Sequence, residues 1–281
     1  MIPKGQPFYK MSGSGNDFVM IDGRSEEVVD ELREPAVVQK ICARATGIGA
    51  DGIVFVQPSN AAAVRLTYLN ADGSRADLCG NATLCTARLA VELGMADPAQ
   101  FDIETDSGLV KARMVGELPE IALPPVSDLR SDAESIALAQ GERRVGYALV
   151  GVPHLVIACD DVTTVDVVGR GRPLRHHPSM PTGANVNFVS QLDSGSRWRM
   201  RTFERGVEAE TLACGSGSVA SAILVTTWAS QQPAPGEAVA VELVTSSGRS
   251  LIVRLQLDSE TWRPTLSGEA RIVFSGSIGQ L

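Results

Sequence analysis

The chain has 281 residues, a formal net charge of −8 and a sequence pI near 5.0. Its length predicts about two domains, and its 44% hydrophobic and 21% charged residues are typical of an ordinary globular protein rather than a disordered or fibrous one. The acidic balance, without a lysine- and arginine-rich run or a long apolar stretch, argues against nucleic-acid-binding and membrane proteins, and we expect a cytoplasmic location.

The predicted elements are many short strands around few helices. A helix-like segment occupies residues 26–45. β-Branched runs predict strands at 53–56, 109–113, 251–255 and 272–274. We therefore expect an α+β fold.

Two further helices are predicted directly behind cysteines. Apolar residues repeat at helical spacing over 84–91, behind Cys79, and over 219–224, behind Cys214. At a helix start, unpaired backbone N–H groups and the helix dipole favour a thiolate and attract a carboxylate. A thiol at each of two such starts is what stereoinversion of an amino acid requires, because one base removes the α-proton and an acid delivers another to the opposite face.

The chain contains this cysteine element twice, which indicates an internal duplication. Cys79-Gly80-Asn81 stands in one half and Cys214-Gly215-Ser216 in the other, and each half also has a short run that ends in Phe-Val, at 15–19 and 185–189. Asn16 precedes Cys79 by 63 residues, whereas Asn187 precedes Cys214 by 27. We therefore predict an insertion in the first half, filled by the helix-like segment.

Turn and linker signals at 123–128 separate the halves. We place the domains at 1–128 and 129–267. The tail at 268–281 is strand-like, and a returning strand that completes the first half is left open.

The other cysteines carry no such element. Cys42, Cys85 and Cys159 are predicted to be packing residues, and no CxxC pair indicates a metal site. All five cysteines are expected to be thiols.

At this point the sequence resembles the diaminopimelate epimerase family, through motifs that follow one another in family order from residue 10 to residue 217. The matching motifs are Lys10–Phe18, Asn70–Ser74, Cys79-Gly80-Asn81, Pro153-His154, Gly183–Phe188, Glu204-Arg205-Gly206 and Glu210–Gly217. The resemblance implies two pseudo-symmetric domains, each a curved sheet around a central helix, and interconversion of LL- and meso-2,6-diaminopimelate without a cofactor or metal.

The resemblance also assigns roles to individual residues. Cys79 and Cys214 match the two acid/base thiols, and His154 and Glu204 match residues that assist the reacting centre. The expected substrate-binding residues are Asn16, Asn70, Gly80, Asn81, Asn187, Glu204, Arg205, Gly215 and Ser216. Because a guanidinium grips a carboxylate with two hydrogen bonds, Arg205 favours a small amino-acid substrate with a second carboxylate.

The match departs from the family at some positions, and alternatives stay open. Val152 stands where many members have a substrate-binding asparagine, Gly52 where some have a glutamine, and residues 82–84 differ from the usual sequence behind the first cysteine. A racemase of another amino acid, such as histidine or a proline-like substrate, is the nearest alternative. A thiol redox or metal-binding protein is a more distant one, and the sequence leaves monomer and homodimer open.

Overall fold

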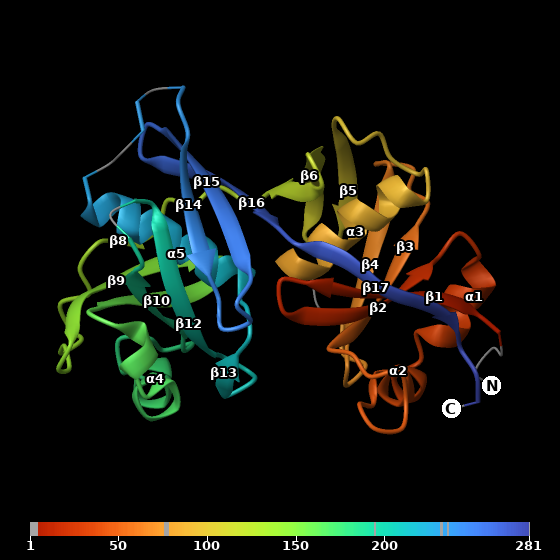
Figure 1. Cartoon of the computed structure of the whole chain (residues 1–281), viewed down its shortest axis with the longest axis horizontal. Helices are drawn as coiled ribbons and strands as arrows, with labels where there is room; N and C mark the ends of the chain where they lie inside the picture. Colours follow the sequence, from red (N-terminus) through yellow and green to blue (C-terminus); the bar gives the residue numbers. More distant parts are fainter. Residues whose placement is uncertain (1–4, 76–78, 194, 231–232, 235, 281) are drawn as a thin grey trace. The chain divides into compact units, whose positions relative to one another are not determined.

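The computed structural model describes residues 5–75, 79–193, 195–230, 233–234 and 236–280. The chain folds into two compact units (Figure 1), Met1–Ile121 with Ser267–Leu281, and Ala122–Leu266. The two units are described separately below.

The first unit is one mixed sheet with three helices among its described residues. Its elements are β1 (Pro7–Gly13), β2 (Asn16–Asp22), α1 (Glu26–Leu32), α2 (Pro35–Cys42), β3 (Gly52–Gln57), β4 (Val64–Asn70), α3 (Gly80–Glu92), β5 (Phe101–Thr105), β6 (Gly108–Val115), β7 (Leu118–Ala122) and β17 (Ala270–Ser277). The strands pair in the order β17–β1–β2–β3–β4–β5–β6–β7, parallel at β2/β3 and β4/β5 and antiparallel elsewhere. In Figure 1 the blue strand β17 accordingly lies among the red and orange elements.

The second unit repeats this pattern. Its elements are β8 (Leu129–Arg130), β9 (Glu142–Val150), β10 (Val152–Cys159), the 3-10 turn η1 (Val162–Thr164), α4 (Val167–Arg175), β11 (Asn185–Gln191), β12 (Arg197–Glu204), β13 (Ala209–Thr211), α5 (Gly215–Trp228), β14 (Val239–Val244), β15 (Ser250–Asp258) and β16 (Thr261–Gly268). The pairing β8–β9–β10–β11–β12–β14–β15 is parallel at β10/β11 and β12/β14 and antiparallel elsewhere. The expected duplication within an α+β fold is confirmed.

The predicted insertion is wrong. Gly52 precedes Cys79 by 27 residues, the same spacing as that of Asn187 and Cys214. Gly52 lies on β3 and Asn187 on β11, and each of these strands is parallel to the strand before it. Asn16 lies instead on β2, the counterpart of β10, so the two Phe-Val runs belong to non-equivalent strands. Residues 26–45 likewise have a counterpart, because η1 and α4 join β10 to β11.

The segment 26–45 also forms two helices rather than one. α1 ends at Leu32 and α2 begins at Pro35. Between them Glu34 has φ −60° and ψ 128°, outside the helical region. A residue that precedes proline avoids the helical conformation because the proline ring clashes with it, and this break is the result.

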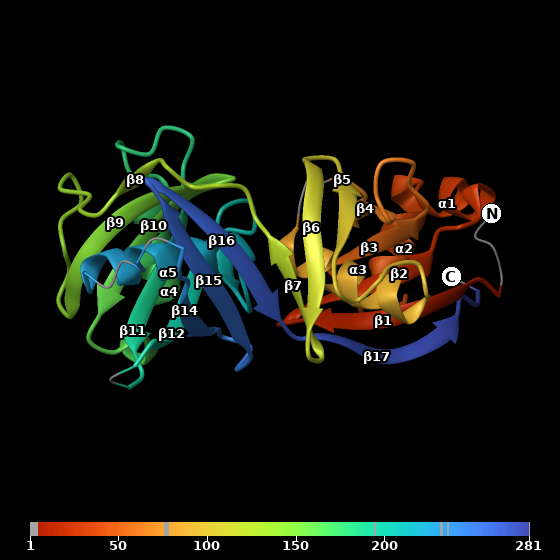
Figure 2. The same ribbon diagram turned by 90° about the horizontal axis from the view of Figure 1, so that it is seen from above.

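The central helix of each unit is largely buried. α3 contacts β1, β2, β3, β4, β6 and β17, and α5 contacts β9, β10, β11, β14 and β15. Figure 2 shows each helix within the curve of its own sheet. From Gly217 to Thr226 every side chain of α5 is buried, which is why its sequence shows small and apolar residues without a polar face. None of the helices in the described residues is both long and apolar enough to cross a membrane.

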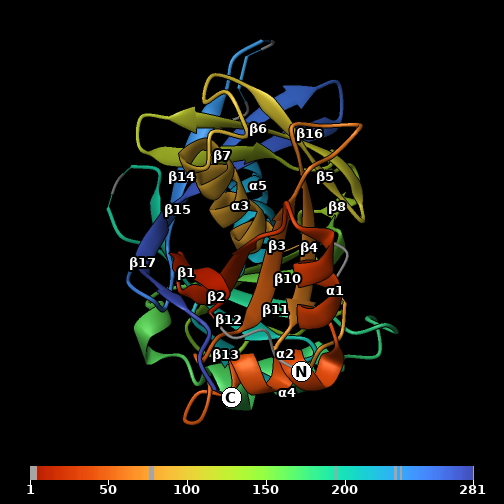
Figure 3. The same cartoon turned by 90° about the vertical axis from the view of Figure 1, so that its right-hand side faces the viewer.

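The other face of each sheet is covered by the shorter helices. In the first unit, side chains of α1 and α2 pack on β2 and β3 in a cluster that contains Leu32, Ile41 and Phe55. Figures 1 and 3 show both helices on the side of β3 away from α3. In the second unit α4 packs in the same way, with Leu174 in a cluster that includes Phe188 and Phe203. β3 and β11 are therefore buried on both faces.

Replacement of Phe188 by alanine is expected to lower the free energy of unfolding by about 3–5 kcal/mol, because a fully buried ring leaves a cavity. Phe274→Ala is the matched control, since this ring is 48% exposed and contacts Phe8 edge to face, and its loss is expected to cost about 1 kcal/mol. Denaturant unfolding of both variants measures the difference, and equal losses would contradict this account of the core.

Candidate active site

Cys79 and Cys214 occupy the same position in their units. Each is the N-cap residue of the central helix and has extended backbone, with φ/ψ of −131°/114° and −137°/110°. The Cys214 sulfur accepts a hydrogen bond from the backbone N–H of Gly217 at 3.4 Å and lies 3.7 Å from the hydroxyl of Ser216. The prediction that both cysteines stand at helix starts is confirmed.

The remaining cysteines lie in apolar surroundings. Burial raises the pKa of Cys42 to about 11 and that of Cys159 to about 12, and it also raises the pKa of the Cys85 thiol on α3. These three side chains therefore stay protonated at neutral pH. All five cysteines lie within the described residues, and none forms a disulfide.

Asn16 and Asn81 meet beside the start of α3. Asn16 Nδ2 donates to the Asp51 carboxylate at 3.0 Å, and Asn16 Oδ1 accepts from Asn81 Nδ2 at 2.6 Å. Asn81 is 2% exposed, and its Oδ1 has no hydrogen-bond partner among the described residues. A buried acceptor without a partner costs about 1–3 kcal/mol, so this oxygen can gain a donor such as an ammonium group.

A chain of charges holds Asp51. Arg44 donates to Asp17 at 2.8 Å and also contacts Asp51, and the buried Lys10 pairs with Asp17 at 2.7 Å. Burial alone raises the pKa of Asp17, but hydrogen bonds from Arg44 and Lys10 and their positive charges outweigh it and leave the pKa below its ordinary value. Arg44 thus links the ionised Asp17 to Asp51, the carboxylate that accepts from Asn16.

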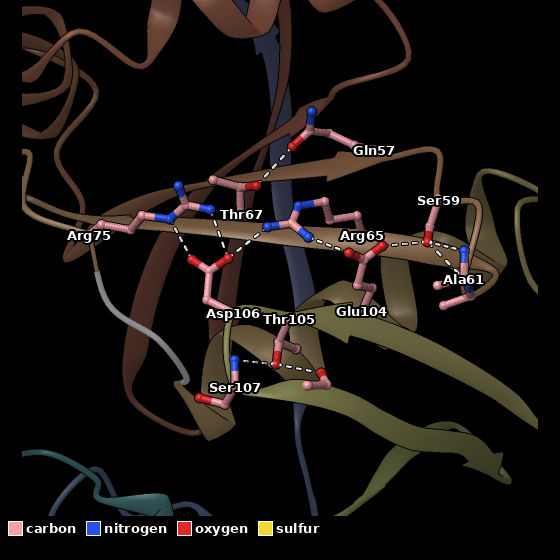
Figure 4. Close-up of polar contacts among 12 residues, drawn as sticks. Gln57, Ser59, Ala61, Arg65, Thr67, Arg75, Glu104, Thr105, Asp106 and Ser107 are labelled. Carbon is pink, nitrogen blue, oxygen red and sulfur yellow. Dashed lines mark hydrogen bonds and ion pairs between the residues drawn. The ribbon is translucent and has the colours of Figure 1, made fainter.

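Asn70 lies at the end of β4, in the turn that leads towards Cys79. Its Nδ2 donates to the hydroxyl of Ser74 at 3.0 Å. The turn is fastened through Arg75, which pairs with Asp106, and Arg65 donates to the same carboxylate at 2.7 Å (Figure 4). This network ties β4 and the chain ahead of Cys79 to the turn after β5.

His154, Asn187 and Thr202 lie side by side on β10, β11 and β12, and all three are almost fully buried. Asn187 Nδ2 lies 3.2 Å from His154 Nδ1 and donates to the Leu155 carbonyl at 3.0 Å, while Thr202 donates to Asn187 Oδ1 at 2.9 Å. Burial and then the charge of Arg205 lower the pKa of His154 to about 3, against a smaller opposing effect of the Val150 backbone. The imidazole is neutral at physiological pH.

Glu204 ends β12, and Arg205 opens the turn to β13. The Arg205 backbone N–H donates to Asn185 Oδ1 at 2.8 Å, and its guanidinium donates to the Thr182 carbonyl at 3.2 Å. Glu208 holds the turn by accepting from the Gly206 N–H at 3.1 Å. Within the described part of the chain, the Arg205 guanidinium forms no ion pair, so it has donors left for an anion.

The structure brings some predicted site residues together and adds others. Asn16 contacts Asn81, and Asn187 contacts His154. Asn187 was expected to bind substrate, but its amide is fully buried and committed to groups of its own unit. Asn185, Thr202 and Asp51 were not predicted as site residues. Asn185 belongs to the Gly183–Phe188 motif, but the motif alone does not tell which of its asparagines holds the Arg205 backbone.

Residue 52 has no room for a side chain. A Cβ at this position would lie 2.4 Å from the Leu69 carbonyl oxygen and 2.5 Å from a ring carbon of Tyr68. The Tyr68 ring thus fills the space that a side chain at residue 52 would need.

Among the described residues, no group of three or more His, Cys, Asp or Glu side chains is arranged to hold a metal ion. Gly80 and Asn81 on one helix start, and Gly215 and Ser216 on the other, offer first-turn backbone N–H groups that can bind a carboxylate.

Solved structures share the fold of the chain at low sequence identity. A phenazine biosynthesis protein of the PhzF family from Bacillus anthracis superposes with a TM-score of 0.75 at 18% identity, over 98% of this chain and 99% of that one. A hydroxyproline epimerase from Agrobacterium vitis superposes with a TM-score of 0.66 at 19% identity, over 98% of this chain and 92% of that one.

Sequence relatives are much closer. The diaminopimelate epimerase of Gemmatimonas aurantiaca is 48% identical over 284 residues, covering 98% of this chain and 99% of the relative. That of Aquifex aeolicus is 37% identical over 286 residues, covering 97% and 98%. The family model of diaminopimelate epimerase matches residues 8–122 and 146–252. With two duplicated units that each start a buried helix at a cysteine, the chain belongs to the diaminopimelate epimerase family of isomerases.

Proposed function

We propose that this enzyme interconverts LL- and meso-2,6-diaminopimelate, a step towards lysine and peptidoglycan, by proton transfer between Cys79 and Cys214 without a cofactor. The observation that carries the proposal is the repeated cysteine at the start of a buried central helix, once in each unit. The relatives named diaminopimelate epimerase support the substrate.

In the LL-to-meso direction, the Cys214 thiolate takes the α-proton and Cys79 donates its thiol proton to the opposite face of the resulting carbanion. One C–H bond breaks and one forms, and the two sulfurs exchange protonation states. Each thiol then serves as the other partner in the reverse reaction. This chemistry requires both thiols at one α-carbon and both reduced, which fits a cytoplasmic enzyme.

The helix starts supply the electrostatics of the proposal. Carbanion charge spreads onto the α-carboxylate, and backbone N–H groups at Gly80-Asn81 and Gly215-Ser216 are fixed donors for such an anion. Asn16 and Asn81 act on the polar groups beside the reacting carbon, where the unpartnered Asn81 Oδ1 accepts from the substrate ammonium. Glu204 and the neutral His154 assist the thiols.

Arg205 selects the second carboxylate of the substrate, with Asn70 as a further polar contact. The backbone of Arg205 is held by Asn185, and its guanidinium keeps donors free of any ion pair within the described residues. A distal carboxylate is the group that distinguishes diaminopimelate from proline-like substrates.

Cys79→Ala and Cys214→Ala are each expected to slow stereoinversion by about 100- to 10,000-fold, because each removes one partner of the proton transfer. Deuterium incorporation at the α-carbon of LL-diaminopimelate and of other amino acids, in deuterated water, measures the effect. Cys159→Ala is the control and is expected to keep the wild-type rate. If another amino acid exchanges fastest, the substrate assignment fails; if none exchanges with reduced thiols, the mechanism fails.

Alkylation of the native protein at pH 7–8 is expected to modify Cys79 first and Cys85 last. Cys79 is partly exposed, whereas Cys85 is fully buried and burial raises its pKa. Mass spectrometry of a time course with iodoacetamide gives the order, and protein unfolded in urea should label at all five positions. Faster labelling of Cys42 or Cys85 would contradict the assignment.

Arg205→Lys is expected to raise the KM for diaminopimelate by about 10- to 100-fold, because a charge-assisted hydrogen bond contributes about 1.5–3 kcal/mol and lysine does not bind a carboxylate in two places. Arg199→Lys, on β12 just before the turn that contains Arg205, serves as the control. An unchanged KM in the Arg205 variant would exclude it from recognition of the distal carboxylate.

A further inference from the structure

The imidazole of His154 contacts the buried side-chain amide of Asn187, which belongs to the same unit. His154 and Asn187 are 0% exposed and Thr202 is 1% exposed. His154 Nε2 has no hydrogen-bond partner among the described residues, although it is buried. In a neutral histidine one ring nitrogen donates a hydrogen bond and the other accepts one. The tautomer therefore decides whether the unpartnered Nε2 is a donor or an acceptor.

The orientation of the Asn187 amide follows from its contacts. One atom of the amide lies 3.0 Å from the Leu155 carbonyl oxygen, which can only accept a hydrogen bond. If the amide were flipped, its own oxygen would face that carbonyl and the two would repel. Nδ2 therefore faces Leu155, and Oδ1 faces the hydroxyl of Thr202, which donates at 2.9 Å.

The same Nδ2 carries a second hydrogen, and His154 Nδ1 lies 3.2 Å away. That nitrogen is placed to accept. We propose that Asn187 is a positioning residue that holds His154 as the neutral imidazole with its proton on Nε2. Thr202 and Leu155 fix the amide, and the amide fixes the tautomer.

This assignment deepens the proposed function and rests on it for the catalytic consequence. An imidazole with its proton on Nε2 donates from that nitrogen and does not accept there, so His154 stabilises an anion such as a thiolate or carboxylate and does not take a proton at Nε2. Nε2 has no hydrogen-bond partner among the described residues, so an anion beside it would give the buried Nε2–H its hydrogen bond.

The Asn187 amide also lies against the start of the helix that follows Cys214. A Cβ at Gly217 would lie 2.3 Å from Asn187 Oδ1 and 3.1 Å from the Cys214 sulfur. Glycine is thus needed at residue 217 for the amide to stand against the first turn of α5. The equivalent position on β3 is Gly52, which has no side chain, so this arrangement is particular to the second unit.

Nuclear magnetic resonance tests the tautomer directly. The chain has three histidines, so two-bond nitrogen–carbon correlations of the full-length protein, with His176→Gln and His177→Gln for assignment, identify the His154 ring. The expected pattern at pH 7 is that of a neutral ring protonated at Nε2. A ring protonated at Nδ1, or at both nitrogens, would overturn the proposal, and this measurement needs no variant at Asn187.

Asn187→Asp supplies the second test. A carboxylate at residue 187 accepts from the ring, so the proton is expected to move to Nδ1, and kcat is expected to fall at least about tenfold while KM stays within about threefold. Ser190→Ala is the matched control, because it removes a buried hydrogen bond from the same strand, to the Val162 N–H, away from His154. An unchanged tautomer and kcat in the folded Asp variant would refute the role of Asn187.

The two proposals fail in different ways. If the wild-type protein exchanges no amino-acid α-proton but His154 shows the Nε2–H pattern, the proposed function falls and the assignment of the tautomer stands. If exchange proceeds but the ring is protonated at Nδ1, the inference falls alone.

Discussion

The whole structure depends on one constraint: the start of a buried helix leaves backbone N–H groups that the helix itself does not use. In each unit the sheet curves round a central helix, and the first residues of that helix are only partly exposed to water. A thiol placed on the N-cap and a carboxylate bound by the first turn both satisfy these groups. In the proposed reaction, each helix start therefore holds an acid/base thiol and offers backbone donors to the anion on which the thiol acts.

Three neighbouring strands carry equivalent positions in the two units, but these positions hold different residues. Strand registers make Asn16, Gly52 and Asn70 of the first unit equivalent to His154, Asn187 and Thr202 of the second. In the first unit the central position is Gly52. The flanking Asn16 bonds to Asp51 and Asn81, and the flanking Asn70 bonds to Ser74. In the second unit the central asparagine joins its neighbours into a closed buried network.

The difference has an electrostatic consequence. The first unit holds Asn16 with a chain of charged groups, from Lys10 through Asp17 and Arg44 to Asp51. The second relies on neutral hydrogen bonds, and there burial keeps the imidazole uncharged. Two copies of one fold therefore place different polar groups near equivalent cysteines.

The family, the α+β fold, the duplication and the two helix starts were predictable from sequence, because local signals carry them: helical spacing behind each cysteine, and motifs whose order is preserved along the chain. The pairing of the repeats was not. Asn16 and Asn187 seemed equivalent because both belong to similar short runs, yet they lie on β2 and β11. Only strand register, a long-range property, showed that Asn187 corresponds to Gly52. The hydrogen bonds of the Asn187 amide were equally hidden, since its partners lie on other strands, His154 and Leu155 on β10 and Thr202 on β12. Sequence names the groups that carry chemistry, but which of their atoms remain available is decided by tertiary packing, because hydrogen bonds between strands use up donors and acceptors that no local pattern records.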